Sequence, residues 1–112
     1  MISPFLAPIF MVMGFYIPMD ANISYYCNCE QCCGIWAGGL TSSGTVPTEG
    51  RTIAMDKRFP FGTEVEINGK VYIVEDRGGA IKGNKIDVFV DSHAEALKRG
   101  RHDDTVYIKI AP

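Results

Sequence analysis

The sequence lacks any dense cluster of lysine or arginine and carries little net charge. Its 11 lysines and arginines stand against 13 aspartates and glutamates, which gives a formal net charge of −2 at pH 7. Proteins that bind nucleic acid usually present a basic patch or stripe to the phosphates. We therefore expect no nucleic-acid partner, and the acidic excess is too small to indicate a cationic one.

The chain also lacks internal repeats, low-complexity tracts and a recognisable linker between domains. Its 112 residues leave room for one domain with a small core. Twelve glycines and many short β-branched runs predict a mostly β domain with frequent turns.

Residues 1–19 contain no charged side chain. This apolar run is similar to a secretory signal or membrane anchor, although no basic residue precedes it and Pro4, Pro8 and Pro18 interrupt a helix. The alternative is an apolar strand or a segment that binds a partner. We therefore separate an apolar segment, residues 1–21, from a domain over residues 22–112, and expect membrane contact only through such an anchor.

Four cysteines fall within seven residues as C-x-C-x-x-C-C, at Cys27, Cys29, Cys32 and Cys33. In an exported chain, dense cysteines are typical of disulfides. A bond between adjacent cysteines is strained, because Cα atoms 3.8 Å apart lie below the usual disulfide range. Pairing of either early cysteine with either late one is easier.

A zinc site is the alternative for this segment. Tetrahedral thiolate sites usually draw their ligands from two separated turns, whereas all four cysteines here lie on one short segment. His93 and His102 offer further nitrogen ligands, but histidines near a helix are more often surface residues. The sequence thus favours disulfides or thiols, and we expect no metal.

The alternation of apolar and polar residues, together with turn and cap residues, predicts the secondary-structure elements. Asn-Gly at residues 68–69 joins two alternating runs and suits a type I′ hairpin. Ser92 with Glu95 three residues later forms a capping box that starts a helix, and Gly100 ends it. The predicted strands are Asn22–Tyr26, Thr52–Met55, Glu64–Ile67, Lys70–Glu75, Lys85–Val90 and Thr105–Ile110.

Six short strands with one helix and long loops fit a small β-barrel. Strand pattern alone does not separate a double-psi β-barrel from an OB-fold or an SH3-like barrel.

The run from Glu75 to Ser92 holds the most unusual composition. It reads E-D-R-G-G-A-I-K-G-N-K-I-D-V-F-V-D-S and places Asp76, Asp87 and Asp91 around a loop with three glycines. Glycine permits positive φ and the close approach of another group. A rigid strand after such a loop is a suitable position for a catalytic acid.

Strand geometry separates two of these aspartates. In an extended strand, the Cα atoms of Asp87 and Asp91 lie roughly 13 Å apart, at about 3.3 Å per residue. Asp91 adjoins the predicted helix cap, where a carboxylate is stabilised by about 0.3–1 kcal/mol. Asp87 lies in mid-strand, where burial and neighbouring carboxylates would raise its pKa and keep it protonated as a general acid.

The pattern D-x-G-G-A-I-K-G-x-x-I-D resembles the signature of the 3D domain, which is named for its three aspartates. That domain is shared with MltA-type lytic transglycosylases and has a double-psi β-barrel fold. Further matching pieces are C-C-G near Cys33, T-S-S-G at Thr41, R-T-I-A-M-D ending at Asp56 and F-G-T at Phe61. The resemblance covers residues 25–110 and implies a mostly β, six-stranded double-psi β-barrel with one short helix.

The resemblance also implies roles for single residues. Asp87 stands at the position of the catalytic acid, and Asp76 matches the first aspartate of the motif, where it tunes the acid or holds substrate. Asp56 corresponds to a family aspartate that faces the same groove; the alternative is an ordinary strand-end residue. The predicted substrate-binding residues are Lys82, Gly78, Gly79 and Asp91; a solvated Lys82, loop-shaping glycines and a cap-neighbouring Asp91 are the alternatives.

The reaction that the resemblance implies needs one acid and no cofactor. A lytic transglycosylase cleaves the bond between N-acetylmuramic acid and N-acetylglucosamine in peptidoglycan glycan strands and leaves 1,6-anhydro ends. Such a chain belongs in the cell envelope or outside the cell, whether bacterial, spore-associated or from a phage. The alternatives are a non-catalytic, expansin-like module that binds wall polysaccharide, and a structural component of a phage tail or spore coat.

Overall fold

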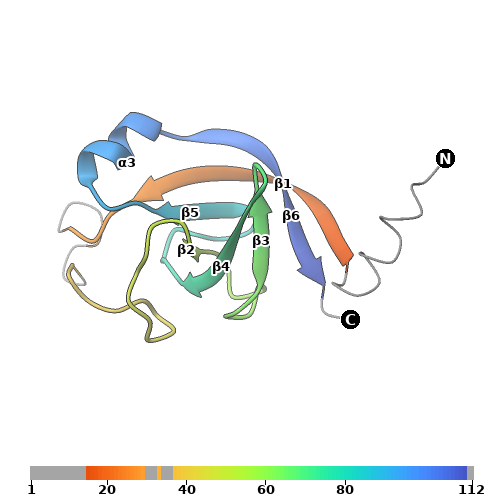
Figure 1. The fold of residues 1–112 in the computed structure, drawn as a ribbon, viewed down its shortest axis with the longest axis horizontal. Coiled ribbons are helices and arrows are strands. Elements are labelled where there is room, and N and C mark those ends of the chain that lie inside the picture. The colour runs from red at the N-terminus through yellow and green to blue at the C-terminus, as the bar shows by residue number, and fades with distance from the viewer. Residues whose placement is uncertain (1–14, 30–32, 34–36, 111–112) are drawn as a thin grey trace.

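The computed structural model describes residues 15–29, 33 and 37–110 of the chain. Six strands form a closed barrel in the order β1-β5-β2-β4-β3-β6, and a short helix lies at one end (Figure 1). The elements are β1 (Phe15–Tyr26), β2 (Thr52–Ala54), β3 (Glu64–Ile67), β4 (Lys70–Asp76), β5 (Lys85–Phe89), α3 (His93–Arg99) and β6 (His102–Ile110). Over the described residues, the prediction of a small six-stranded barrel with one short helix is confirmed.

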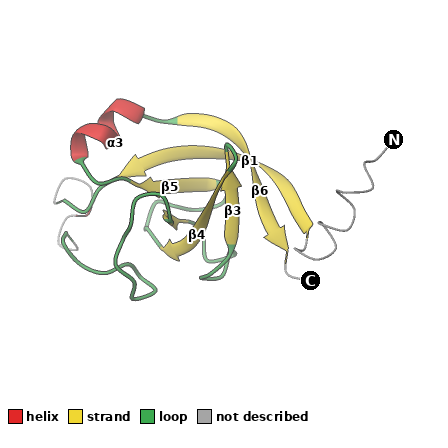
Figure 2. Cartoon of the chain, in the orientation of Figure 1, coloured by secondary structure: helices red, strands yellow, loops and turns green. Residues whose placement is uncertain are grey.

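Two parallel pairs interlock the barrel. β1 pairs with β5 and β2 with β4 in parallel, whereas the remaining neighbours are antiparallel. This arrangement, in which β2 lies between β4 and β5, fits the double-psi β-barrel. Strands and loops make up nearly all of the drawn molecule (Figure 2). The barrel therefore brings the end of β4 and the middle of β5 to the two sides of one short strand.

Alternating aliphatic side chains fill the barrel. Within β5, Ile86 and Val88 point into the main core, which leaves Asp87 on the other face of the strand. Burying one such aliphatic side chain contributes about 1.5–3 kcal/mol. Fully buried members of this core include Ile23, Ile53, Met55, Val65, Val74, Ile86 and Val106.

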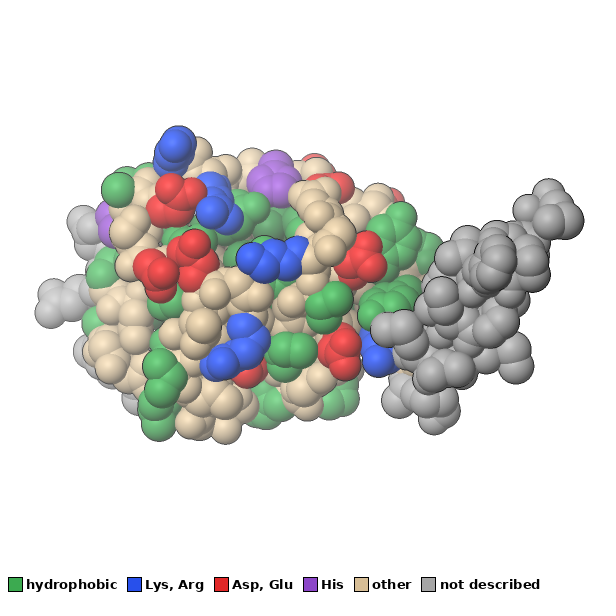
Figure 3. Space-filling view, in the orientation of Figure 1, with side chains coloured by type: hydrophobic (Ala, Val, Ile, Leu, Met, Phe, Trp, Pro, Cys, Tyr) green, Lys and Arg blue, Asp and Glu red, His purple; other side chains and the backbone are tan. Residues whose placement is uncertain are grey.

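On the face shown in Figure 3, acidic and basic side chains are interspersed.

The hairpin and the helix cap form as predicted. Asn68 and Gly69 take positive φ values of 51° and 80°, as a type I′ turn requires. Ser92 Oγ accepts a hydrogen bond from the Glu95 backbone N–H at 3.1 Å. Gly100 ends the helix with φ 66°.

Strand β1 begins earlier than predicted. It starts at Phe15 rather than Asn22, because residues 15–23 pair antiparallel with β6, which itself begins at His102 rather than at Thr105. Pro18 fits in this section because the strand pairs there on one side only, with β6. The expected boundary at residue 21 thus falls inside a strand.

Residues 1–14 of the expected apolar segment lie outside the described residues. Among the residues that the structure describes, no helix has the length and apolar character needed to cross a membrane.

Candidate active site

The glycine loop and the barrel enclose a hollow of about 610 Å³. Five residues of the motif line it: Asp76, Gly78, Gly79, Ile81 and Asp87. The structure therefore brings together two of the three predicted catalytic aspartates and both of the predicted substrate-binding glycines. Earlier parts of the chain complete the wall with Tyr26, Asn28, Cys33 and residues 39–42.

Asp76 and Asp87 lie across β2 from each other. Both are register partners of Ala54, Asp76 through the parallel β2–β4 pair and Asp87 through the antiparallel β2–β5 pair. Two strand spacings of about 4.8 Å place their Cα atoms about 10 Å apart. Ala54 itself lines the hollow, so its small side chain leaves the space between the carboxylates open.

The Asp87 carboxyl group is half-buried in mid-strand. Its Oδ1 accepts a hydrogen bond from Ser24 Oγ at 2.9 Å, and Ser24 is its register partner on β1. Burial raises the pKa of Asp87, and the negative charge of Asp76 adds to the rise, whereas the Ser24 hydroxyl and Arg101 lower it. Because burial is the largest cause, Asp87 retains its proton to higher pH than an ordinary aspartate.

The Asp76 carboxylate is held by four donors. Its Oδ1 accepts hydrogen bonds from the backbone N–H and hydroxyl of Ser42, both at 2.9 Å, and from the Arg77 backbone N–H at 2.9 Å. Its Oδ2 accepts the Tyr26 hydroxyl at 2.7 Å. All four contacts use Asp76 as an acceptor, which suits a positioning role better than proton donation.

Tyr26 is a site residue that the sequence analysis missed. Its ring packs edge-on against Phe89, with centroids 5.5 Å apart. Burial and the neighbouring Asp76 raise the pKa of Tyr26 far above its usual range, so the phenol stays protonated and donates. A tyrosine at a strand end carries no motif, and neither Tyr26 nor Ser24 can be assigned without the β1–β5 register.

The Arg77 guanidinium is directed to the loop backbone. It donates to the carbonyls of Phe59 at 2.8 Å and Met55 at 3.4 Å, and it stacks on the Phe61 ring at 4.1 Å. Its backbone N–H donates to the Asp76 carboxylate at 2.9 Å, whereas the guanidinium reaches only the Asp76 backbone carbonyl, at 3.2 Å.

Asp56 lies outside the wall of this hollow. Its Oδ2 accepts the Gly83 backbone N–H at 2.7 Å, and Oδ1 accepts the Arg58 backbone N–H at 3.3 Å. The Gly83 hydrogen bond is the main reason that the pKa of Asp56 is lowered. Asp56 therefore anchors the glycine loop through Gly83, and its geometry suits support better than contact with substrate.

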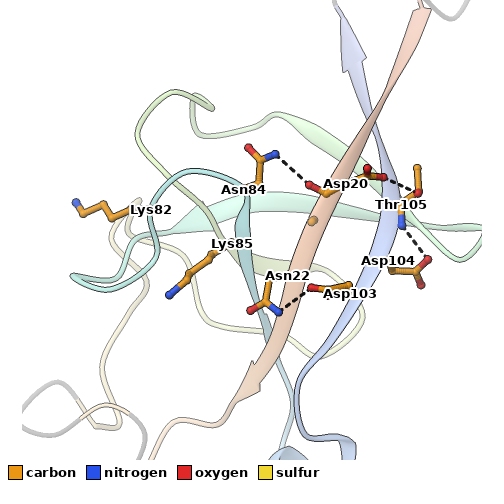
Figure 4. A pocket seen from close by; sticks show the side chains of 9 residues that line it. Asp20, Asn22, Lys82, Asn84, Lys85, Asp103, Asp104 and Thr105 are labelled. Carbon is orange, nitrogen blue, oxygen red and sulfur yellow. Dashed lines mark hydrogen bonds between the residues drawn. The ribbon is translucent and has the colours of Figure 1, made fainter.

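Lys82 lines a different hollow, of about 750 Å³, between the loop and the β1–β6 ribbon (Figure 4). The carboxylates there are already engaged: Asp103 accepts from Asn22 at 3.0 Å, and Asp20 accepts from Thr105 at 2.9 Å. In the close-up, Lys82 extends away from both pairs. The structure thus separates Lys82 from Asp87.

Asp91 is exposed and lines neither hollow. Its backbone N–H donates to Glu49 Oε1 at 2.7 Å, one residue before the helix cap at Ser92. Asp91 therefore lies where the sequence placed it, next to the helix cap.

The structure explains why two positions of the loop are glycine. A Cβ at Gly78 would lie 2.9 Å from Ile81 Cγ1, so a larger residue would force the Ile81 side chain or the loop to shift. Gly83 has φ 62°, in the left-handed region that favours glycine. Gly79 is open to the hollow.

The domain is a closed six-stranded barrel of the double-psi type, with two interlocked parallel strand pairs. Its hollow carries a half-buried aspartate, Asp87, and a second aspartate, Asp76, that is held by four hydrogen bonds. The chain belongs to the 3D domain family, whose model matches residues 51–110.

Two curated relatives come from Bacillus subtilis (strain 168). YabE, named as a candidate cell wall shaping protein, is 37% identical over 92 residues, which are 80% of this chain and 22% of YabE. The cell wall-binding protein YocH is 39% identical over 77 residues, 64% of this chain and 26% of YocH. The chain thus spans about a quarter of the length of each relative.

Among solved structures, the barrel is similar to MltA from Escherichia coli, described as a lytic transglycosylase fold. The TM-score is 0.54 at 27% identity, over 65% of this chain and 28% of MltA. A structure of MltA with bound chitohexaose matches with a TM-score of 0.53 at 26% identity, over the same shares of the two chains.

Proposed function

We propose that this chain is a lytic transglycosylase that cleaves the bond between N-acetylmuramic acid and N-acetylglucosamine in peptidoglycan. The observation that carries the proposal is Asp87: a half-buried carboxyl group with a raised pKa on the wall of an open hollow. Membership of the 3D family and the likeness to MltA support a cell-wall substrate. The chitohexaose bound to MltA supports an extended glycan as the ligand.

Asp87 acts as the general acid in the first step. Its proton passes to the oxygen that links the two sugars, the bond from that oxygen to C1 of the muramic acid breaks, and the electron pair stays on the departing oxygen. Ser24 donates to Oδ1. This contact directs the proton of the acid to Oδ2.

The same carboxylate completes the second step. The C6 hydroxyl oxygen of the muramic acid forms a bond to C1, and its proton returns to Asp87. The product carries a 1,6-anhydro ring, no water is consumed, and the acid is regenerated. One carboxyl group suffices here, in contrast to glycosidases that pair an acid with a base or nucleophile.

Asp76 serves as a positioning residue in this scheme. Its negative charge helps to keep Asp87 protonated. Its four hydrogen bonds connect the loop at Ser42, the end of β1 at Tyr26 and the glycine loop at Arg77 to one carboxylate. Gly79 leaves room for a glycan beside it.

Mass spectrometry of digested peptidoglycan tests the proposal. Wild type should release anhydro-muropeptides, and Asp87→Asn should reduce their rate by about 10²–10⁴-fold while it keeps the fold. Asp91→Asn is the matched control and should retain activity, since Asp91 lies outside the hollow. Wild-type activity in Asp87→Asn would exclude Asp87 as the acid.

The likeness to the wall-binding protein YocH favours a second candidate, a module that binds wall polysaccharide without cleaving it. In that case, wild type would sediment with purified cell walls, and no new anhydro ends would form.

A further inference from the structure

A cluster of soft metal ligands lies where β1 meets α3. Cys27 and Cys29 follow the end of β1, and His93 is the first residue of α3. His93 Nδ1 lies 3.8 Å from Cys27 Sγ and 3.5 Å from Cys29 Sγ, and the two sulfurs are 3.0 Å apart. Cys27 is buried, whereas Cys29 and His93 are half-buried, so the cluster is sheltered but reachable.

We propose that Cys27 Sγ, Cys29 Sγ and His93 Nδ1 bind a zinc ion. Zinc bonds of about 2.3 Å to sulfur and about 2.0 Å to nitrogen, at tetrahedral angles, place sulfur and nitrogen about 3.6 Å apart. The two observed sulfur–nitrogen distances, 3.5 and 3.8 Å, match this edge. All three ligand atoms lie within 4.8 Å of one another.

The sulfur–sulfur distance separates zinc from a disulfide less sharply. At 3.0 Å it exceeds the bond length of about 2.05 Å and is shorter than a zinc edge of about 3.8 Å. Zinc binding therefore requires the two sulfurs to move apart by about 0.8 Å. The sulfur–nitrogen distances favour zinc, because a disulfide between Cys27 and Cys29 sets no distance between His93 Nδ1 and either sulfur.

The position of His93 reverses the preference drawn from the sequence. Four cysteines on one segment were expected to lack ligands from a second, separated turn, but His93 at the start of α3 reaches Cys29 from 64 residues away in the sequence. Cys33 is turned elsewhere: its Sγ donates to the Cys27 carbonyl at 3.2 Å, and its side chain packs against the Tyr26 cluster. Cys32 lies outside the described residues.

The site would brace the wall of the proposed active site. Asn28, between the two cysteines, accepts from the Gly38 backbone N–H at 2.8 Å and donates to the Gly39 carbonyl at 3.2 Å. Residues 39–42 line the hollow, and Ser42 holds Asp76. Zinc therefore links α3, the end of β1 and the loop that positions Asp76; this consequence, unlike the site itself, rests on the proposed function.

Metal content measures the proposal directly. The full chain, expressed with added zinc and purified under reducing conditions without chelator, should contain one zinc per molecule by elemental mass spectrometry. Substitution with cobalt(II) should produce the visible absorption of a tetrahedral thiolate site. His93→Ala and Cys29→Ser should weaken zinc binding by about 100-fold or more, because each removes a direct ligand.

His102→Ala is the matched control. His102 Nε2 contacts the Tyr25 hydroxyl at 2.9 Å and lies outside the cluster, so this variant should keep its zinc. Circular dichroism establishes that each variant is folded.

Three results would overturn the proposal: a folded wild type without stoichiometric zinc, unchanged zinc affinity in His93→Ala, or a Cys27–Cys29 disulfide located by peptide mapping of protein purified without reductant. The test is independent of the proposed reaction, because Asp87→Asn should bind zinc as wild type does whether or not wild type cleaves glycan.

Discussion

Ser24 Oγ donates a hydrogen bond of 2.9 Å to Asp87 Oδ1, and the two residues face each other directly in the parallel pair β1–β5. This contact opposes burial: the hydroxyl favours the ionised carboxylate, while desolvation favours the protonated acid. Burial prevails, so Asp87 combines a raised pKa with a fixed orientation. Both properties suit a general acid.

Ser24→Ala should shift the pH profile of glycan cleavage. Without the hydroxyl, the pKa of Asp87 rises further, because the contact that favours its ionised form is lost. The alkaline limb of kcat/KM against pH should therefore move to higher pH. Initial rates of anhydro-muropeptide release across a pH series measure the shift.

Thr105→Ala is the control for that experiment. Thr105 Oγ1 makes an equivalent hydroxyl–carboxylate contact, 2.9 Å to Asp20, away from Asp87. Its profile should overlay that of wild type. A Ser24→Ala profile shifted to lower pH would contradict the assignment of Asp87 as the acid.

Asp87→Asn should change the pH dependence of stability. Because the folded pKa of Asp87 is raised, the folded state binds the proton more tightly than the unfolded state does. The stability from this group is fully present below the unfolded pKa of about 3.9 and is lost as pH rises through the folded pKa. The Tm of Asp87→Asn minus that of wild type should thus be more positive at pH 7 than at pH 3.

Asp56→Asn should change the pH dependence of stability in the opposite direction. The Gly83 backbone hydrogen bond lowers the folded pKa of Asp56, so its contribution is present above the unfolded pKa and is lost as pH falls through the folded pKa. Thermal melts should show this variant less stable than wild type at pH 7, with the difference shrinking toward pH 2. Equal differences at both pH values would contradict the Gly83–Asp56 contact.

Tyr26→Phe should impair activity more than binding. It removes the hydroxyl that donates to Asp76 Oδ2 at 2.7 Å and leaves the ring packed against Phe89. We expect a loss of about 1.5–3 kcal/mol in stability, since the bond reaches a charged group, and a lower kcat with KM little changed. Urea denaturation and steady-state cleavage assays measure the two effects.

Tyr107→Phe is the matched substitution at an exposed strand position, where Tyr107 is 40% accessible. Its stability should stay within about 0.5 kcal/mol of wild type. If Tyr26→Phe behaves in the same way, the Tyr26–Asp76 contact has no role in the site.

Thr52→Val tests the buried support behind β4. Thr52 Oγ1 donates to Glu75 Oε1 at 2.7 Å and accepts the Thr48 backbone N–H at 2.9 Å, and both Thr52 and Glu75 are buried. Valine would remove both hydrogen bonds, each worth about 0.5–1.5 kcal/mol, while Glu75 Oε1 keeps its contact with Arg51 Nε at 3.2 Å. Urea denaturation should show the loss, whereas Thr105→Val at an exposed position should be nearly neutral.

Local signals in the sequence were sufficient for most elements. The Asn68-Gly69 turn, the Ser92 cap and the alternation of β5 each depend on residues close together in the chain, and all three formed as expected. The start of β1 was missed because its residues 15–21 are held by β6, more than 80 positions away. Hydrophobic pattern alone could not separate that strand from an export segment.

The sequence by itself determined the chemistry available: a motif with two aspartates suited to one site, a glycine loop and a dense group of thiols. Only the tertiary structure decided which of these residues meet. β2 sets Asp76 and Asp87 on either side of Ala54, while Asp56 and Lys82 lie outside their hollow. The reason is physical, since such contacts depend on the register of strands that are distant in sequence, and no local pattern encodes that register.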